Sequence, residues 1–208
     1  MGECSNTVWQ LIKRDLYRYG GRTDIIALLN KLIYKPGFQF SFWFRLVNHF
    51  RKKRKLFYPL WLTSRFMLHH YRVKYGIQIS AYTDLGPGLY IGYVGTIVVN
   101  RRAVIGADCN IGPGVTIGAK NDGVHKGVPV IGDRVYIAGG AKILGSVKIG
   151  NDVLIGANCV VVHDVPSGAI VAGIPDSVLS YSSSASYMKF TTTAPSPQPT
   201  TSPPLTEP

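Results

Sequence analysis

At 208 residues the chain is long enough for one substantial core and a small accessory region. Hydrophobic residues make up 46% of it, and its 23 glycines favour a compact protein rich in turns. Cys4, Cys109 and Cys159 are too few and too scattered for a disulfide framework or a paired-cysteine metal site, so no metal is expected. No apolar run approaches the roughly 20 residues of a spanning helix. The first ten residues lack the apolar stretch of a secretory signal, which favours a reducing, cytoplasmic compartment.

The formal net charge of +12 is concentrated in the first third of the chain. Residues 1–75 contain 15 Lys and Arg and three acidic residues, whereas residues 76–208 contain eight of each kind. The excess positive charge of residues 1–75 therefore equals that of the whole chain. Such an asymmetry is a clue to the function of this region.

Residues 1–76 are predicted to form a basic helical region. The apolar residues from Val8 to Tyr19 follow helical spacing, and the pair Gly20-Gly21 is expected to end that helix. Thr23 can cap a second helix over residues 24–33. Two prolines are well placed in the first turns of two further helices, and a run of five bases separates these helices. The residues concerned are Pro36, Pro59 and the run Arg51-Lys52-Lys53-Arg54-Lys55.

From about residue 77 the hydrophobic period changes to six. Aliphatic residues recur at this spacing, and eight of the twelve are followed directly by Gly. They are Leu85, Ile91, Ile97, Ile105, Ile111, Ile117, Ile131, Ile137, Ile143, Ile149, Ile155 and Val161. A period of six fits neither a helix nor a simple strand, and repeats of this kind decide the fold.

The period predicts a triangular solenoid over residues 77–181. Each hexad would form one short strand and a corner, so three hexads complete a coil, and coils would stack at about 4.8 Å. The aliphatic residue points inward, and several coils must stack before this inward surface is buried. The period breaks between Ile117 and Ile131, where we predict an excursion loop. Residues 182–208 are dominated by Ser, Thr and Pro, which predicts a disordered tail.

The repeat, the loop and the ending Val171-Ala172-Gly173-Ile174-Pro175 resemble the hexapeptide-repeat acyltransferases, and most of all the serine acetyltransferases, especially the short type found with exopolysaccharide genes. Matching segments are residues 86–92, 112–118, 141–145 and 155–158. The resemblance implies an all-β left-handed parallel β-helix with an N-terminal α-helical region. It also implies a homotrimer whose substrates lie in a cleft between adjacent prisms.

The chemistry that this resemblance implies is direct transfer of an acetyl group from acetyl-CoA to a hydroxyl, without an acyl-enzyme. Acetyl-CoA would be a co-substrate, and no cofactor would be bound permanently. A general base removes the hydroxyl proton as the oxygen attacks the thioester, and such proton transfer contributes roughly 10² to 10⁴ in rate. The acceptor would be serine, or a sugar hydroxyl in polysaccharide biosynthesis.

The sequence departs from the family pattern at the expected catalytic and substrate-binding residues. Tyr93 stands where the family keeps its His, Gly92 where it keeps an Asp, and Gln78 where it keeps an acid. A second family His is replaced by Val128, and His125 lies three residues earlier in the same loop. Tyr93 and His125 are thus the two candidate bases. The alternative is a non-catalytic or regulatory homologue that has lost the base.

The binding site for CoA is expected at residues with small side chains, which leave room for a thin ligand, and at residues with basic side chains. The resemblance assigns this role to Ala138, Gly139, Lys142, Ala157 and His163. The glycines also have a purely structural interpretation, because Gly suits the corners of a prism. Asp176 stands where relatives carry another base.

Three interpretations of the basic helical region remain open. It can be ordinary surface of an assembly region, it can contact an anionic membrane peripherally at the inner face, or it can bind nucleic acid. No recognition motif accompanies the charge, so nucleic acid is the least favoured of the three and is not expected as a partner.

Overall fold

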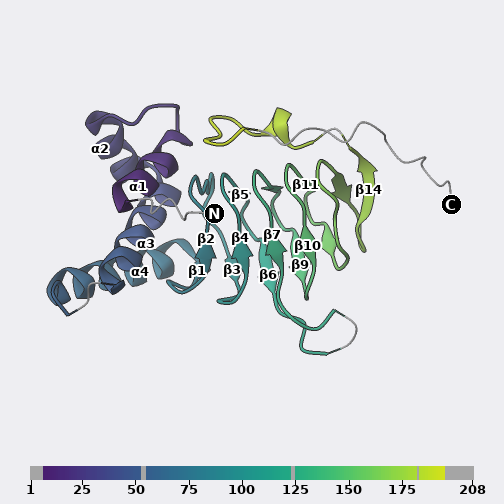
Figure 1. Ribbon diagram of the computed structural model, residues 1–208, viewed down its shortest axis with the longest axis horizontal. Helices are drawn as coiled ribbons and strands as arrows, with labels where there is room; N and C mark the ends of the chain where they lie inside the picture. The colour runs from purple at the N-terminus through teal and green to yellow at the C-terminus, as the bar shows by residue number, and fades with distance from the viewer. Residues whose placement is uncertain (1–6, 53–54, 123–124, 182, 195–208) are drawn as a thin grey trace, which may run out of the picture.

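The computed structural model describes residues 7–52, 55–122, 125–181 and 183–194. Helices gather at one end of the molecule, and a prism of short strands extends from them (Figure 1). No helix in the described part of the chain combines the length and the apolar character needed to cross a membrane. The change from helices to strands falls at Gly76, which agrees with the change of period in the sequence.

Four helices precede the prism, as the sequence predicts. They are α1 (Val8–Tyr17), α2 (Ile25–Tyr34), α3 (Pro36–Lys52) and α4 (Tyr58–Tyr75). A capping box between Thr7 and Gln10 begins α1. The cap of α2 differs from the prediction, because the carboxylate of Asp24, rather than Thr23, accepts from the amide of Ala27. Pro36 begins α3, and α4 ends at Gly76 in the left-handed conformation that glycine adopts readily.

The prism has three sheets, one per side. The first sheet contains β1 (Ile77–Ile79), β3 (Ile97–Val99), β6 (Thr116–Gly118), β9 (Lys142–Leu144) and β12 (Val160–Val161). The second contains β2 (Asp84–Leu85), β4 (Val104–Ile105), β7 (Val130–Ile131) and β10 (Lys148–Ile149). The third contains β5 (Asn110–Ile111), β8 (Tyr136–Ile137), β11 (Leu154–Ile155), β13 (Ile170–Ala172) and β14 (Ser177–Ser180). All pairings are parallel except that of β13 with β14.

The core of the prism is the row of repeat aliphatics. All twelve are buried, and the small residues four positions later fill the space between them. These small residues are Cys109, Val115, Val135, Ala141, Val147, Val153 and Cys159. The predicted solenoid, with its helical region in front, is therefore confirmed. Because the period is six, each of the three sides of a coil directs one aliphatic side chain into the interior.

Successive coils turn at three edges, which we name for later use. The glycine edge joins the third sheet to the first and consists of residues 92–96, 112–115, 138–141 and 156–159. The loop edge joins the first sheet to the second and carries the excursion loop, residues 119–129. The tail edge joins the second sheet to the third, and residues 183–194 run along it (Figure 1).

The segment at the tail edge differs from the disorder expected for residues 182–208. The amide of Ser184 donates to the carbonyl of Asp152 (2.9 Å), and that of Thr192 donates to the carboxylate of Asp108 (2.9 Å). The hydroxyl of Thr193 also donates to Asp108 (2.8 Å). The segment is thus held by hydrogen bonds to polar groups of the prism rather than by a core of its own. Residues 182 and 195–208 lie outside the described residues.

A buried ion pair joins the helices to the first coil. The carboxylate of Asp15 accepts from two guanidinium nitrogens of Arg45 (2.9 and 3.1 Å) and from the amides of Gly88 and Leu89 (2.8 and 3.1 Å). Arg45 donates further to the carbonyl of Leu85 (2.8 Å). Both charged side chains are buried. Every oxygen of Asp15 is therefore partnered, and α1, α3 and the first coil are held together.

The two described cysteines, Cys109 and Cys159, are free and buried in the interior of the prism. Burial raises the pKa of the Cys109 thiol to about 12 and that of Cys159 to about 11. Both thiols therefore stay protonated near neutral pH, which suits a role in packing rather than in nucleophilic chemistry.

Candidate functional site

The glycine edge brings together five of the predicted site residues. Gly92 and Tyr93 lie on its first coil, Ala138 and Gly139 two coils further on, and Ala157 on the next. The coils are tied to one another along this edge, because the amide of Gly140 donates to the carbonyl of Pro113 (2.8 Å) and that of Asn158 to the carbonyl of Gly139 (3.0 Å). These five residues thus follow one line along the prism.

Stacking of the coils explains part of the glycine content at this edge. A Cβ on Gly112 would lie 2.7 Å from the amide nitrogen of Gly139, so no side chain fits there. Gly114 and Gly140 also have positive φ angles of 72° and 77°. Beyond Tyr93 and Val94 on its first coil, small residues leave most of the outer surface of this edge without long side chains. A narrow ligand can therefore lie along the edge.

Two more predicted residues lie on the outer side of the first sheet. Gln78 and Lys142 point outward in the same row, which the register of the sheet completes with Val98, Thr116 and Val160. The ammonium of Lys142 donates to the carbonyl of Gly114 (2.6 Å) and to the hydroxyl of Thr116 (3.2 Å). Lys142 therefore lies beside the glycine edge, with its charge held against the backbone of that edge.

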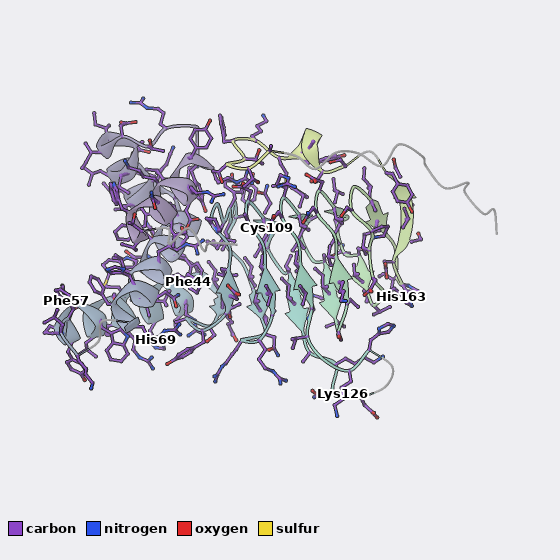
Figure 2. All side chains as sticks on the ribbon, viewed as in Figure 1. Phe44, Phe57, His69, Cys109, Lys126 and His163 are labelled. Carbon is purple, nitrogen blue, oxygen red and sulfur yellow. The ribbon has the colours of Figure 1, made fainter. Side chains whose placement is uncertain are left out.

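His125 and His163 lie on the opposite side of the first sheet, at the loop edge. Figure 2 shows His163 near the end of the prism, on the side from which the loop with Lys126 extends. The rings of His125 and His163 are 6.0 Å apart and nearly perpendicular. The Nδ1 atom of His163 lies 3.5 Å from a carboxylate oxygen of Asp176, which is only 7% exposed. His163 therefore does not join Ala138, Gly139 and Ala157 on their edge.

The contact with Asp176 gives the loop edge an acid next to the imidazole of His163. Asp176 also accepts from the amide of Val162 (3.1 Å), so its carboxylate is fixed in position. A fixed carboxylate can orient the imidazole that it contacts. This contact of Asp176 could not be predicted, because Asp176 lies 13 positions after His163 and only the register of the coils brings the two residues together.

Tyr93 is 78% exposed and borders a hollow over the third sheet. The hollow has a volume of about 370 Å³ and lies between the prism, the helices and the segment 183–194. Its lining is rich in aromatic rings and bases, among them Tyr90, Tyr136, Tyr187, Phe190, Lys35 and Lys189. Sequence reasoning missed this hollow. The outward positions of Tyr90, Asn110 and Tyr136, each just before a repeat aliphatic, were the available signal.

Comparison with known proteins identifies the family. A family model described as bacterial transferase hexapeptide (six repeats) matches residues 129–163. The serine acetyltransferase of Helicobacter pylori is 34% identical over 142 residues, which cover 68% of this chain and 80% of that protein. The chain belongs to the serine acetyltransferase family. The likeness to this family that the sequence indicated is therefore confirmed.

Two other serine acetyltransferases support the same family assignment. The enzyme of Synechococcus elongatus is 34% identical over 151 residues, 73% of this chain and 60% of that protein. The structure of Neisseria gonorrhoeae serine acetyltransferase in complex with serine is 28% identical, with a TM-score of 0.66, and the match covers 83% of this chain and 69% of that chain. The predicted left-handed parallel β-helix is confirmed by this likeness. The chain spans 60% of the length of the Synechococcus relative.

Proposed function

We propose that the protein transfers an acetyl group from acetyl-CoA to a hydroxyl. The observation that carries this proposal is membership of the serine acetyltransferase family, with 80% of the Helicobacter pylori relative matched. The retained glycine edge and excursion loop support it. In the reaction the acceptor oxygen attacks the thioester carbonyl, a base takes the hydroxyl proton, and the carbon–sulfur bond breaks. The released thiolate of CoA then takes up a proton.

The glycine edge suits the extended arm of CoA. Coils stack about 4.8 Å apart, so the three steps from the coil of Tyr93 to the coil of Ala157 span about 14 Å. We place the thioester at the coil of Tyr93 and the arm along Gly139 and Ala138 toward Ala157. Lys142 lies beside this line and supplies a positive charge. Holding both substrates in this way lowers the entropic barrier of the transfer.

We assign the general base to His125 and a hydrogen bond to the acceptor to Tyr93. An imidazole has an ordinary pKa of about 6.5 and accepts a proton near neutral pH, whereas a phenol with a pKa of about 10 accepts one only as the rare phenolate. The ring of His163 lies 6.0 Å from that of His125, and His163 in turn contacts Asp176, so two imidazoles and a carboxylate are connected at the loop edge. The position of Tyr93 in the family pattern favours it as the general base, whereas the greater basicity of an imidazole near neutral pH favours His125 for that role.

This assignment requires two copies of the chain. Tyr93 lies on the glycine edge and His125 on the loop edge, so the width of the first sheet separates them within one chain. They can act on one substrate when the glycine edge of one prism faces the excursion loop of another. We therefore propose a homotrimer with its cleft between adjacent prisms.

The acceptor is serine if the chain follows its relatives, and a specific observation favours a sugar as the second candidate. Aromatic rings line the hollow beside Tyr93, and Lys35 and Lys189 lie among them. Flat rings offer apolar faces to a sugar ring, and the two bases suit a phosphate attached to it. The hollow thus fits a phosphorylated sugar better than it fits a free amino acid, which would connect the protein with polysaccharide biosynthesis.

The experiment is to measure release of free CoA from acetyl-CoA with each acceptor in turn. L-serine, N-acetylglucosamine and glucose 1-phosphate are the probes, and an assay without acceptor gives the background. We expect acceptor-dependent release with at least one of them. Tyr136→Ala should lower the rate with a sugar acceptor and leave that with serine unchanged. If no acceptor raises the rate above background, the non-catalytic alternative replaces the proposed function.

A further inference from the structure

The outer side of α4 has the composition of a surface that binds an anionic membrane. Leu62, Phe66 and Val73 follow one another at i, i+4 and i+11 and are each at least half exposed. A helix on the surface of a globular protein ordinarily turns such residues inward, and α4 already does so with Leu68. The exposed residues therefore form a second apolar stripe, which the rest of the described chain leaves uncovered.

Bases flank this stripe and line a cavity beside it. The cavity has a volume of about 490 Å³ and lies between α4 and the turn after β1. Leu62, Phe66 and Ala81 contribute apolar walls, and Arg65, Arg72 and His69 contribute the bases. Figure 2 marks His69 on α4, at the helical end of the molecule. An apolar stripe with bases along its sides is typical of helices that lie in the plane of a membrane interface.

No acidic residue close in sequence to Arg65 and Arg72 balances their positive charges. The pKa of Arg72 is lowered, first by burial and then by the positive charge of Arg65. Its Nε–H is buried and makes no hydrogen bond within the described residues. Residues 25–83 contain eleven Lys and Arg and no Asp or Glu. An anion in the cavity would supply the missing acceptor and relieve the repulsion between the two guanidinium groups.

This distribution of charge indicates which kind of partner can bind the α4 surface. A second copy meeting the same surface would bring like charges together, because that surface has no carboxylates to offer. Nucleic acid would pair with the bases but would leave Leu62, Phe66 and Val73 without a role. We propose that the α4 surface docks on an anionic lipid bilayer, with the apolar stripe in the interface and a lipid phosphate at Arg65 and Arg72. The proposal does not depend on acetyl transfer.

The experiment is cosedimentation of the full chain with vesicles at low salt. Vesicles of phosphatidylcholine with phosphatidylglycerol should bind the protein, and vesicles of phosphatidylcholine alone should bind it weakly. Raising the salt concentration should weaken binding because it screens the charges. Arg65→Gln with Arg72→Gln should weaken binding on the order of 30-fold, at roughly fivefold per base near the surface. Leu62→Gln with Phe66→Gln should weaken it at least tenfold.

A matched control changes two exposed apolar residues at the other end of the prism. Ile174→Gln with Leu179→Gln should leave vesicle binding unchanged. Replacing all of residues 51–55 by Gln extends the charge test, with an expected loss on the order of 10³-fold; Lys53 and Arg54 lie outside the described residues. Circular dichroism and light scattering on every variant check that fold and assembly are intact.

Four outcomes would overturn the proposal. One is that wild type ignores anionic vesicles at low salt. Another is that the Leu62 and Phe66 variant loses assembly mass while its vesicle binding stays at the wild-type level, which would make the stripe an interface between copies. A third is equal binding to duplex DNA and to vesicles, unaffected by the apolar changes. The last is full competition by glycerol phosphate at concentrations comparable to the accessible lipid, which would indicate a site for a free phosphate.

Discussion

Replacing Tyr93 by His is expected to raise acetyl transfer by roughly 10² or more in a protein whose His125 has been changed to Ala. The change puts an imidazole with a pKa of about 6.5 at the corner of the glycine edge where the family keeps its base. At mildly alkaline pH this imidazole is largely neutral and can accept the proton of the acceptor hydroxyl. Tyr93 is exposed, so the smaller ring is accommodated without repacking. The measurement is kcat for free CoA release with each acceptor.

His125→Ala separates the two candidate bases. If His125 is the base, this change should lower kcat of the natural protein by roughly 10² or more and should matter much less in the Tyr93→His background. Asp176→Asn should lower kcat to a smaller extent, because it removes the carboxylate that contacts His163. If His125→Ala left kcat unchanged, the general base would have to be a residue of the glycine edge instead.

Asp15→Ala is expected to lower the free energy of unfolding by about 3–5 kcal/mol, because it leaves a buried guanidinium without its partner. The change also removes the acceptor of two amides, those of Gly88 and Leu89. The measurement is urea unfolding followed by circular dichroism. Asp24→Ala is the control. Asp24 pairs with Arg22 at an exposed position, so its loss should cost far less than that of Asp15.

The double variant Asp15→Ala with Arg45→Ala refines this test. Removing both charges leaves no unpaired ion in the interior, so its cost should fall well below the sum of the two single changes. A cost equal to that sum would mean that the two residues stabilise the joint independently. That result would contradict the account of α1, α3 and the first coil as one unit held by this pair.

The prism could be predicted from the sequence because its core depends on local pattern alone. Each hexad places its aliphatic residue inward regardless of the other coils, so Ile111 or Ile137 can be assigned without knowing its neighbours. The same reasoning placed Gly92, Ala138 and Ala157 on corners. The start of a helix at Pro36 followed from the backbone preference of proline.

The remaining features depend on contacts between distant residues. Ser and Thr in residues 183–194 indicate that no core forms there, but not that the buried carboxylate of Asp108 accepts hydrogen bonds from Thr192 and Thr193. The pairing of His163 with Asp176 depends on the register of two coils. Hydroxyls and carboxylates pair with many partners, and composition alone does not select among them.

The measurement that tests the central claim most directly is a crystal structure of the protein with CoA bound. We expect the pantetheine arm along the glycine edge, past Gly139, with its sulfur at the coil of Tyr93. His125 of a neighbouring copy should face that sulfur across the cleft. A CoA molecule bound away from the glycine edge, or a sulfur remote from Tyr93, would contradict the account.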